Sequence, residues 1–182
     1  MAMLSAAGVH CVAMPPDIDE QALKQVFPGP ASALPGALAL AKARAISTRM
    51  PDALVIGADQ ILLFHGGLFD KPHSLAVAAA QLRELSGQTH ELIAAVCLMR
   101  GGAPLWQHSE SASLTMRPFS EAFLTDYLDA EGEALLHSVG AYRLEGLGAQ
   151  LFEHVRGDYF TVLGLPLLAL LGALRAEGVL KV

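Results

Sequence analysis

The chain has 182 residues, enough for one domain with a sizeable hydrophobic core. Hydrophobic residues make up 53% of it, which excludes an intrinsically disordered protein. Charged residues make up only 16% and the formal net charge is -6, so no nucleic-acid polymer is expected as a partner, because that role needs clustered Lys and Arg. A small phosphate ligand remains compatible with this charge. So few charges also leave surface for a partner chain, and a homodimer is compatible with the composition.

The predicted elements in the first half of the chain alternate strands and helices. A short apolar segment is bounded by Pro15-Pro16, and an Ala- and Leu-rich segment typical of a helix is bounded by Pro51. A buried strand follows, and its continuation forms one arm of a hairpin with Gly66-Gly67 at the tip. In chain order we predict a strand over 9–14, an extended acidic stretch over 17–20, a helix over 37–50 and strands over 53–56 and 61–64.

In the second half, Ser74 and Ser120 stand at the N-cap position of two predicted helices. Two long strand patterns flank Gly101-Gly102 and predict a second hairpin. In chain order we predict a helix over 74–86, strands over 91–99 and 104–116, a helix from 120 to about 130, a strand over 149–155 and a helix over 166–178. Hairpins together with crossovers predict an α/β fold around a mixed sheet, in a single domain over residues 1–182.

Cysteines and apolar segments bear on the compartment. Cys11 and Cys97 lie in apolar runs far apart in the sequence, so we expect two buried thiols in a reducing compartment. The N-terminus lacks the basic flank and long apolar stretch of a signal peptide. The most apolar segment, residues 164–174, is too short to span a bilayer and contains Pro166. We therefore expect a cytoplasmic protein with no membrane partner.

Asp59 is the first candidate for chemistry. It follows an apolar strand, where a chain leaving a sheet presents side chains to a cleft. Gly57 allows the backbone to turn or to approach a ligand closely. A carboxylate in this place can bind a metal or deprotonate a water molecule. An aspartate that caps a helix or stabilises a turn is the structural alternative, and the residues alone favour neither interpretation.

A second candidate is the acidic cluster of Asp17, Asp19 and Glu20, whose carboxylates repel one another unless a cation is near. Mg²⁺ binds such oxygens and keeps positions for water and substrate phosphates. From the residues alone, a solvated acidic loop is the favoured alternative. Lys42 and Lys71 could each present a compact cation to a phosphate, although most single lysines are surface residues. The seven histidines lack zinc-ligand spacing, and we predict no role for them.

Two glycine-rich blocks complete the candidates. Residues 140–148 form a turn with an acid in it, which can bring backbone and carboxylate close to a flat ligand. Residues 157–166 lead into a helix N-terminus, a place suited to anions. Each block is weak by itself, because glycine-rich turns are common.

Taken in order, these segments resemble the Maf family, and the resemblance spans nearly the whole chain. It is carried by residues 17–20, Lys42, 57–59, Lys71-Pro72, 85–91, 140–142, 145–148, 157–159 and 162–167. The resemblance implies an α/β fold with a mixed central sheet, flanking helices and a cleft between two lobes. It also implies hydrolysis of nucleoside triphosphates to monophosphate and pyrophosphate with a divalent cation, Mg²⁺ or Mn²⁺.

The resemblance also implies roles for single residues. Asp59 is similar to the family's proton acceptor for the attacking water and to a metal ligand, and Glu20 to a metal-associated carboxylate. Lys42 and Lys71 are similar to the family's triphosphate contacts. These roles agree chemically, because the metal and the lysines neutralise the phosphates while a carboxylate directs water at the α-phosphorus.

Two further positions concern the base. Members of the family that hydrolyse pyrimidine triphosphates have Thr after the catalytic Asp and Gln before the Gly-x-Gly turn, whereas this chain has Gln60 and Glu145. That pattern is similar to members that hydrolyse 7-methyl-GTP. Glu145 could accept both N–H groups of a guanine edge, while uracil and thymine would meet it with an acceptor. We therefore expect a guanine-type base, and Glu145→Gln tests it.

The first residues depart from the family pattern. Maf proteins open with a strand and a Ser-x-Ser-Pro-Arg-Arg-like loop that holds phosphates, whereas this chain opens with residues 1–8, similar to the end of the helix after that loop. No Arg or Lys occurs before Lys24. Either the sequence starts late or the loop is lost. The second possibility gives an alternative function: a catalytically impaired nucleotide-binding protein with a role in division control. A generic α/β domain with unrelated ligands is a third.

Overall fold

The computed structural model describes residues 2–181, which form two compact units. Unit 1 contains the chain up to Gln60, the segment Ala94–Glu110 and the chain from Gly164 onward. Unit 2 contains Ile61–Ile93 and Ser111–Leu163.

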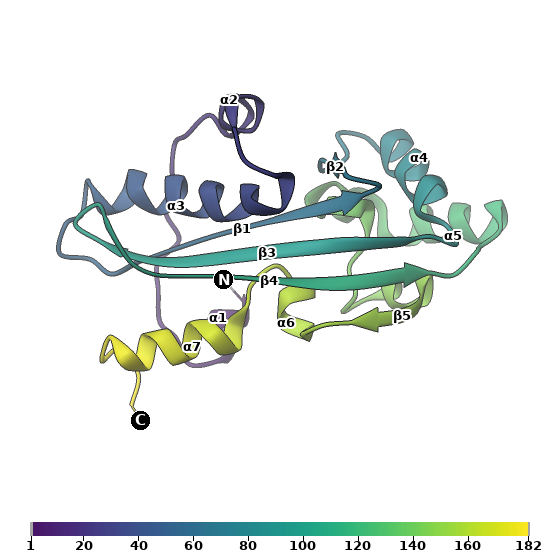
Figure 1. Cartoon of the computed structure of the whole chain (residues 1–182). Helices are drawn as coiled ribbons and strands as arrows, with labels where there is room; N and C mark the ends of the chain where they lie inside the picture. The colour runs from purple at the N-terminus through teal and green to yellow at the C-terminus, as the bar shows by residue number, and fades with distance from the viewer. Residues whose placement is uncertain (1, 182) are drawn as a thin grey trace. The chain divides into compact units, whose positions relative to one another are not determined.

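Five strands are hydrogen-bonded in the order β2-β1-β3-β4-β5 (Figure 1). They are β1 (Val55–Phe64), β2 (Gly67–Phe69), β3 (Thr89–Arg100), β4 (Ala103–Met116) and β5 (Phe152–Arg156). The α/β class is confirmed, but the sheet is antiparallel rather than mixed. The length of the turns is the physical reason for two of the pairings. Two residues with positive φ connect β1 to β2 (His65, Gly66) and β3 to β4 (Gly101, Gly102), and so tight a connection joins only antiparallel strands.

The helices follow the predicted caps. In unit 2, the Ser74 hydroxyl accepts a hydrogen bond from the Val77 N–H at 3.3 Å, and the Ser120 hydroxyl accepts one from the Phe123 N–H at 3.2 Å. The helices of unit 1 are α1 (Ala2–Ala6), α2 (Glu20–Val26), α3 (Leu34–Ser47) and α7 (Leu167–Ala176). Those of unit 2 are α4 (Leu75–Leu85), α5 (Glu121–Glu131) and α6 (Tyr159–Val162). Short 3₁₀ turns cover Ala31–Ala33, Gly132–His137, Val139–Ala141 and Leu147–Leu151.

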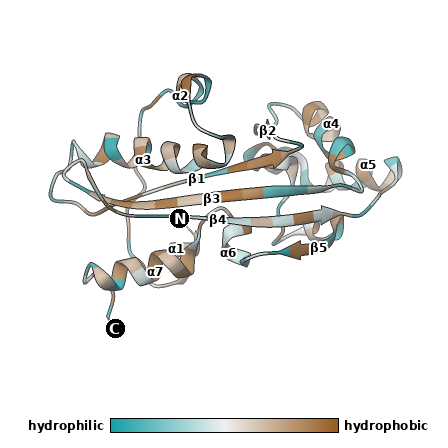
Figure 2. Cartoon of the chain, viewed as in Figure 1, coloured by the Kyte–Doolittle hydropathy of each residue, from teal (hydrophilic) through white to brown (hydrophobic). Residues whose placement is uncertain are grey.

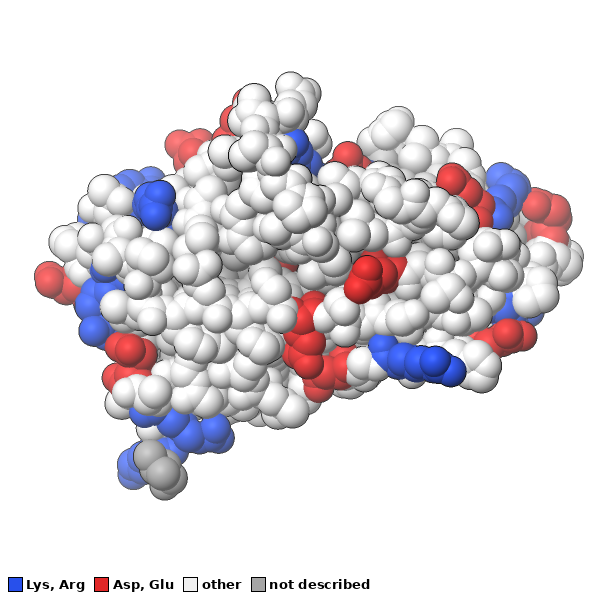
Figure 3. All heavy atoms as spheres, viewed as in Figure 1, with Lys and Arg blue, Asp and Glu red and all other residues white. Residues whose placement is uncertain are grey.

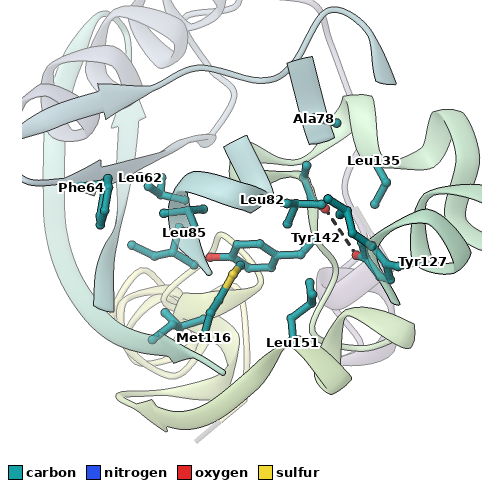
Figure 4. Close-up of a cluster of buried hydrophobic side chains, with 14 of the residues drawn as sticks. Leu62, Phe64, Ala78, Leu82, Leu85, Met116, Tyr127, Leu135, Tyr142 and Leu151 are labelled. Carbon is teal, nitrogen blue, oxygen red and sulfur yellow. Dashed lines mark hydrogen bonds between the residues drawn. The ribbon is translucent and has the colours of Figure 1, made fainter. Parts of the chain in front are cut away.

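Each of the two units contains a cluster of buried hydrophobic side chains. Unit 1 has a small cluster built around Ala39, Ala43, Ala95, Cys97 and Met99, where α3 packs on the strands. Figure 2 shows the C-terminal half of β3, which contains Ala95, Cys97 and Met99, as strongly hydrophobic. Unit 2 has a larger cluster rich in leucine and aromatic residues, and Figure 4 shows Tyr142 among Leu82, Leu85 and Met116.

Some predicted elements are wrong. Residues 9–14 form no strand: Val9 is buried, but Cys11, Val12 and the residues up to Pro15 are exposed, so the predicted burial of the Cys11 thiol is also wrong. Pro15 and Pro16 have no N–H with which to continue a ladder. The Cys97 thiol is buried as predicted.

Two strand boundaries also differ from the prediction. The strands predicted over 53–56 and 61–64 are one continuous strand, β1, so Asp59 lies inside it and not beyond its end. The strand predicted from 149 begins only at Phe152, after a 3₁₀ turn. Both errors concern where an element begins or ends, which is the part of a pattern that propensity determines least.

Two properties of the surface concern membranes and charge. No helix within residues 2–181 is long and apolar enough to cross a membrane. On the face drawn in Figure 3, Lys and Arg side chains lie in separate small groups, in keeping with the net charge of -6.

Candidate functional site

Three predicted residues, Glu20, Lys42 and Asp59, meet in unit 1, and we call them the charged triad. Asp59 lies in β1, Lys42 in the middle of α3, and Glu20 is the first residue of α2. The Lys42 ammonium donates a hydrogen bond to Asp59 Oδ1 at 2.6 Å and lies 3.1 Å from Glu20 Oε1. Two carboxylates separated by 39 residues in the sequence therefore converge on one cation.

Burial differs across the charged triad. The Asp59 side chain is 10% exposed, Lys42 21% and Glu20 41%. Burial raises the pKa of Asp59 above its ordinary value, against the opposing effect of Lys42. Burial alone would lower the pKa of Lys42, but its hydrogen bonds and charge attraction to Asp59 and Glu20 outweigh it, so the pKa of Lys42 is raised. At neutral pH the lysine stays charged, and the carboxylate is a stronger proton acceptor than a solvated one.

Gly57 allows this arrangement. A Cβ atom on Gly57 would lie 2.3 Å from the Ala39 carbonyl oxygen and 2.7 Å from Ala43 Cβ. Glycine therefore lets α3 approach β1 closely. Lys42, three residues after Ala39 on the same helix, can then reach Asp59. The alanine-rich composition of α3, which predicted a helix, also supplies the small side chains of this contact.

Glu20 is held mainly by polar contacts, since none of the α2 residues is buried. The Asp19 carboxylate accepts a hydrogen bond from the Ala22 N–H at 2.9 Å and so caps α2. An apolar groove of about 610 Å³ lies between α2 and α3. Of the predicted acidic cluster, Asp19 thus has a structural role, Asp17 is exposed with a positive φ, and Glu20 alone joins the charged triad.

A divalent cation fits the charged triad. Glu20 and Asp59 present hard carboxylate oxygens to one point, where the Lys42 ammonium already stands as a cation. Within residues 2–181 no group of three or more acidic, His or Cys side chains could hold a metal alone. Such a donor set suits Mg²⁺, which is commonly bound by one or two carboxylates together with water and substrate phosphates.

One charged neighbour of Asp59 was missed from the sequence. The positive charge of Lys24 acts to lower the pKa of Asp59, so Lys24 lies near the charged triad. It stands four residues after Glu20 on α2, and this i, i+4 spacing was the signal that could have placed both on one helix face. Gln60 follows Asp59 on β1, and its side chain lies near Gly164, where an added Cβ would be 3.4 Å from Gln60 Oε1.

The remaining predicted residues, Lys71 and Glu145, belong to unit 2. Lys71 is exposed in the segment between β2 and α4. Glu145 is exposed in the turn Leu144–Gly146, which the Gly146 N–H closes by a hydrogen bond of 3.2 Å to the Arg143 carbonyl. Gly148 packs so closely on Arg143 that a Cβ atom there would lie 2.4 Å from the same carbonyl oxygen. The glycines of this block therefore shape a tight turn that presents Glu145 to solvent.

Comparison with known proteins agrees with the sequence pattern. The family described as Maf-like protein matches residues 1–177. A nucleoside triphosphate pyrophosphatase from Granulibacter bethesdensis is 50% identical, over 99% of this chain and 93% of that protein. A 7-methyl-GTP pyrophosphatase from Rhizobium etli is 49% identical, over 97% and 90%. A nucleoside triphosphate pyrophosphatase from Caulobacter vibrioides is 50% identical, over 99% and 92%. On a match of this extent, the chain belongs to the Maf family.

Proposed function

We propose that this protein hydrolyses nucleoside triphosphates to a monophosphate and pyrophosphate, with a divalent cation. The observation that carries the proposal is the charged triad, in which Glu20 and Asp59 both lie within 3.1 Å of the Lys42 ammonium. Relatives about 50% identical over almost the whole chain are named nucleoside triphosphate pyrophosphatases, which supports the same reaction here.

In this reaction Asp59 is the proton acceptor. Its carboxylate takes a proton from a water molecule as the water oxygen attacks the α-phosphorus, the bond between the α-phosphorus and the bridging oxygen breaks, and pyrophosphate leaves. Burial suits Asp59 to the role, since the raised pKa brings its basicity closer to neutral pH. The fixed Lys42 ammonium holds the carboxylate in one orientation, so little reorganisation is needed when water arrives.

The second requirement of the reaction is that cations neutralise the negative charge of the phosphates. The family resemblance assigns a triphosphate contact to each of Lys42 and Lys71, whose ammonium groups are compact cations. Glu20 and Asp59 would hold a divalent cation, Mg²⁺ or Mn²⁺, which neutralises developing phosphate charge when bound. Glu20 is the more exposed of the two carboxylates and so can turn from Lys42 toward a cation at little cost.

We further propose that the base is of the guanine type, for example 7-methylguanine. Glu145 is exposed at the tip of its turn and, when ionised, accepts hydrogen bonds but donates none. Guanine offers adjacent N1–H and N2–H donors, which one carboxylate can accept together. Gln60 occupies the other position at which family members differ according to the base of their substrate. A 7-methyl-GTP pyrophosphatase from Rhizobium johnstonii, 47% identical, adds support for this class of substrate.

The test is pyrophosphate release from GTP, 7-methyl-GTP, UTP and dTTP, with Mg²⁺ or Mn²⁺, by wild type and Asp59→Asn. We expect turnover that requires the metal, prefers guanine-type bases and falls about a thousandfold in the variant. Nucleotide binding with no turnover above that of Asp59→Asn would refute the enzyme and favour a nucleotide-binding Maf protein. A preference for UTP would refute the base assignment alone.

A further inference from the structure

The histidine of the segment 85–91 and the tyrosine of the glycine-rich block meet inside unit 2. His90 Nε2 and the Tyr142 hydroxyl are 2.6 Å apart, although the residues are separated by 52 positions. Their exposed fractions are 3% and 5%, so both are buried. The contact joins the start of β3 to the loop 140–148 that contains Glu145.

Both groups are held neutral. Burial lowers the pKa of His90 to about 4 and raises the pKa of Tyr142, so at neutral pH the tyrosine keeps its proton and the imidazole lacks its second one. The Tyr142 hydroxyl can then donate to His90 Nε2, with the ring hydrogen on Nδ1. Nδ1 has no partner within residues 2–181, so the contact with Tyr142 is the one protein hydrogen bond of this ring that orients it.

The neighbours of Tyr142 are fixed as well. The Tyr127 hydroxyl donates to the Ala141 carbonyl at 3.4 Å, the interaction drawn as a dashed line in Figure 4. The Arg143 guanidinium donates two hydrogen bonds, of 2.6 and 3.0 Å, to the buried Glu131 carboxylate. Ala141 has a φ of 58°, a left-handed conformation that a residue with a side chain keeps only when its surroundings impose it.

The contacts of Ala141, Tyr142 and Arg143 hold the chain immediately before the turn that contains Glu145. The Arg143 carbonyl accepts the hydrogen bond that closes the turn, and Gly148 packs against the same backbone. Glu145 itself is exposed, and a charge that lies near it is that of Arg143, whose guanidinium is bound to Glu131. The direction in which Glu145 points therefore depends on the backbone at residues 141–143. Ala141 and Tyr142 are both buried in the aromatic and leucine cluster, and Tyr142 is the one of the two whose side chain can form a hydrogen bond there.

We infer that His90 and Tyr142 are positioning residues for base recognition: their buried hydrogen bond sets the conformation of the loop that presents Glu145. The inference rests on the base-reading role proposed above for Glu145. It assigns a function to a histidine for which the sequence predicted none. A misplacement of about 1 Å in a recognition group costs up to about a hundredfold, so the pair should govern base selectivity without touching the nucleotide.

A matched set of variants separates positioning from stability. Tyr142→Phe removes only the hydroxyl. His90→Gln keeps an amide atom close to the position of Nε2, whereas His90→Asn is too short to reach it. Leu114→Ala opens a cavity in the same cluster without removing either hydrogen-bonding group of the pair, which makes it the stability control. Glu145→Gln reports on the proposed base reading itself.

The measurement is the ratio of the dissociation constants of UMP and GMP by calorimetry, which needs no turnover, followed by kcat and KM for GTP and UTP. We expect Tyr142→Phe and His90→Asn to lower the GMP preference about tenfold and to raise KM for GTP, with kcat changed less than about threefold. His90→Gln and Leu114→Ala should stay near wild type.

An unchanged ratio in Tyr142→Phe and His90→Asn, beside a changed ratio in Glu145→Gln, would overturn the positioning role alone. An equal loss in Leu114→Ala would also overturn it, because general loosening would then suffice. An unchanged ratio in Glu145→Gln would refute the base reading and the positioning role together.

Discussion

The charged triad of unit 1 is partly exposed and the His90–Tyr142 pair of unit 2 is buried, and the two polar arrangements are built on opposite principles. In the triad the Lys42 ammonium lies between two carboxylate groups, at 2.6 Å from Asp59 and 3.1 Å from Glu20. In the pair both groups are neutral, and burial keeps them so. The carboxylates and the ammonium of the triad can bind phosphates, protons or a cation in place of one another. The neutral pair can form a hydrogen bond that fixes the local conformation. The triad is therefore suited to catalysis, and the pair is suited to fixing the conformation of a loop.

The largest effect should come from Lys42→Met, which keeps most of the side-chain stem but removes the charge shared by Asp59 and Glu20. We expect kcat/KM to fall about a hundredfold to a thousandfold, because a fixed phosphate contact and the orientation of Asp59 are both lost. The factor should be the same for GTP and UTP, since the phosphates are common to both. Pyrophosphate release from each substrate measures it, and a loss confined to one base would break the division of roles between the two regions.

Gly57→Ala should have the next largest effect. The new Cβ would meet the Ala39 carbonyl at 2.3 Å, a backbone atom that cannot rotate away, so α3 must move. We expect a loss of about 3 kcal/mol in the free energy of unfolding, together with reduced turnover as Lys42 moves from Asp59.

Gly36→Ala is the control for this change on the same helix. There the new methyl group would meet only the Ser109 hydroxyl, at 3.7 Å, and alanine favours the helix. Unfolding in denaturant measures both variants. Equal stability of the two variants would show that the close approach of α3 to β1 is not what places the charged triad.

In both regions the sequence predicted local features better than contacts between residues far apart in the chain. Caps, glycine turns and the apolar pattern of β3 are local signals, and they predicted α4, α5 and the second hairpin. Asp59, Lys42 and Glu20 were predicted by motif, but their mutual distances depend on α3 packing against β1, a contact between residues far apart in the chain. His90 was given no role because the histidines lack zinc-ligand spacing, and its actual partner, 52 residues away, cannot be identified from local spacing. Residues 9–14 failed for the same reason, since an apolar run becomes a strand only where a neighbouring strand is free to pair with it.

The pH dependence of stability tests the neutrality of the pair. The pKa of His90 is lowered from 6.5 to about 4, so above pH 6.5 both folded and unfolded states hold the ring neutral. As the pH falls below 6.5 the unfolded state takes up a proton first, and stability is lost until about pH 4. By pH 5 this loss should be about 2 kcal/mol.

His90→Gln, which cannot titrate, isolates this contribution from that of the carboxylates. The difference in unfolding free energy between wild type and His90→Gln should shift by that amount between pH 7.5 and pH 5, and an NMR titration of the ring gives the pKa directly. A difference that stays constant across this range would mean that His90 is protonated in the folded protein or exposed to water.

The smallest expected effect, and the most specific, is that of Glu145→Gln. The amide keeps one acceptor and replaces the other by a donor, so one of the two proposed hydrogen bonds to a guanine edge is lost, and the preference for GTP over UTP should fall about tenfold. The value of kcat should hardly change, because Asp59 and Lys42 are untouched. Glu153→Gln, at an exposed position on β5 in the same unit, removes the same charge without touching the turn and should leave the ratio unaltered. If both variants changed the ratio equally, the effect would be one of long-range charge, and the turn would have no role in reading the base.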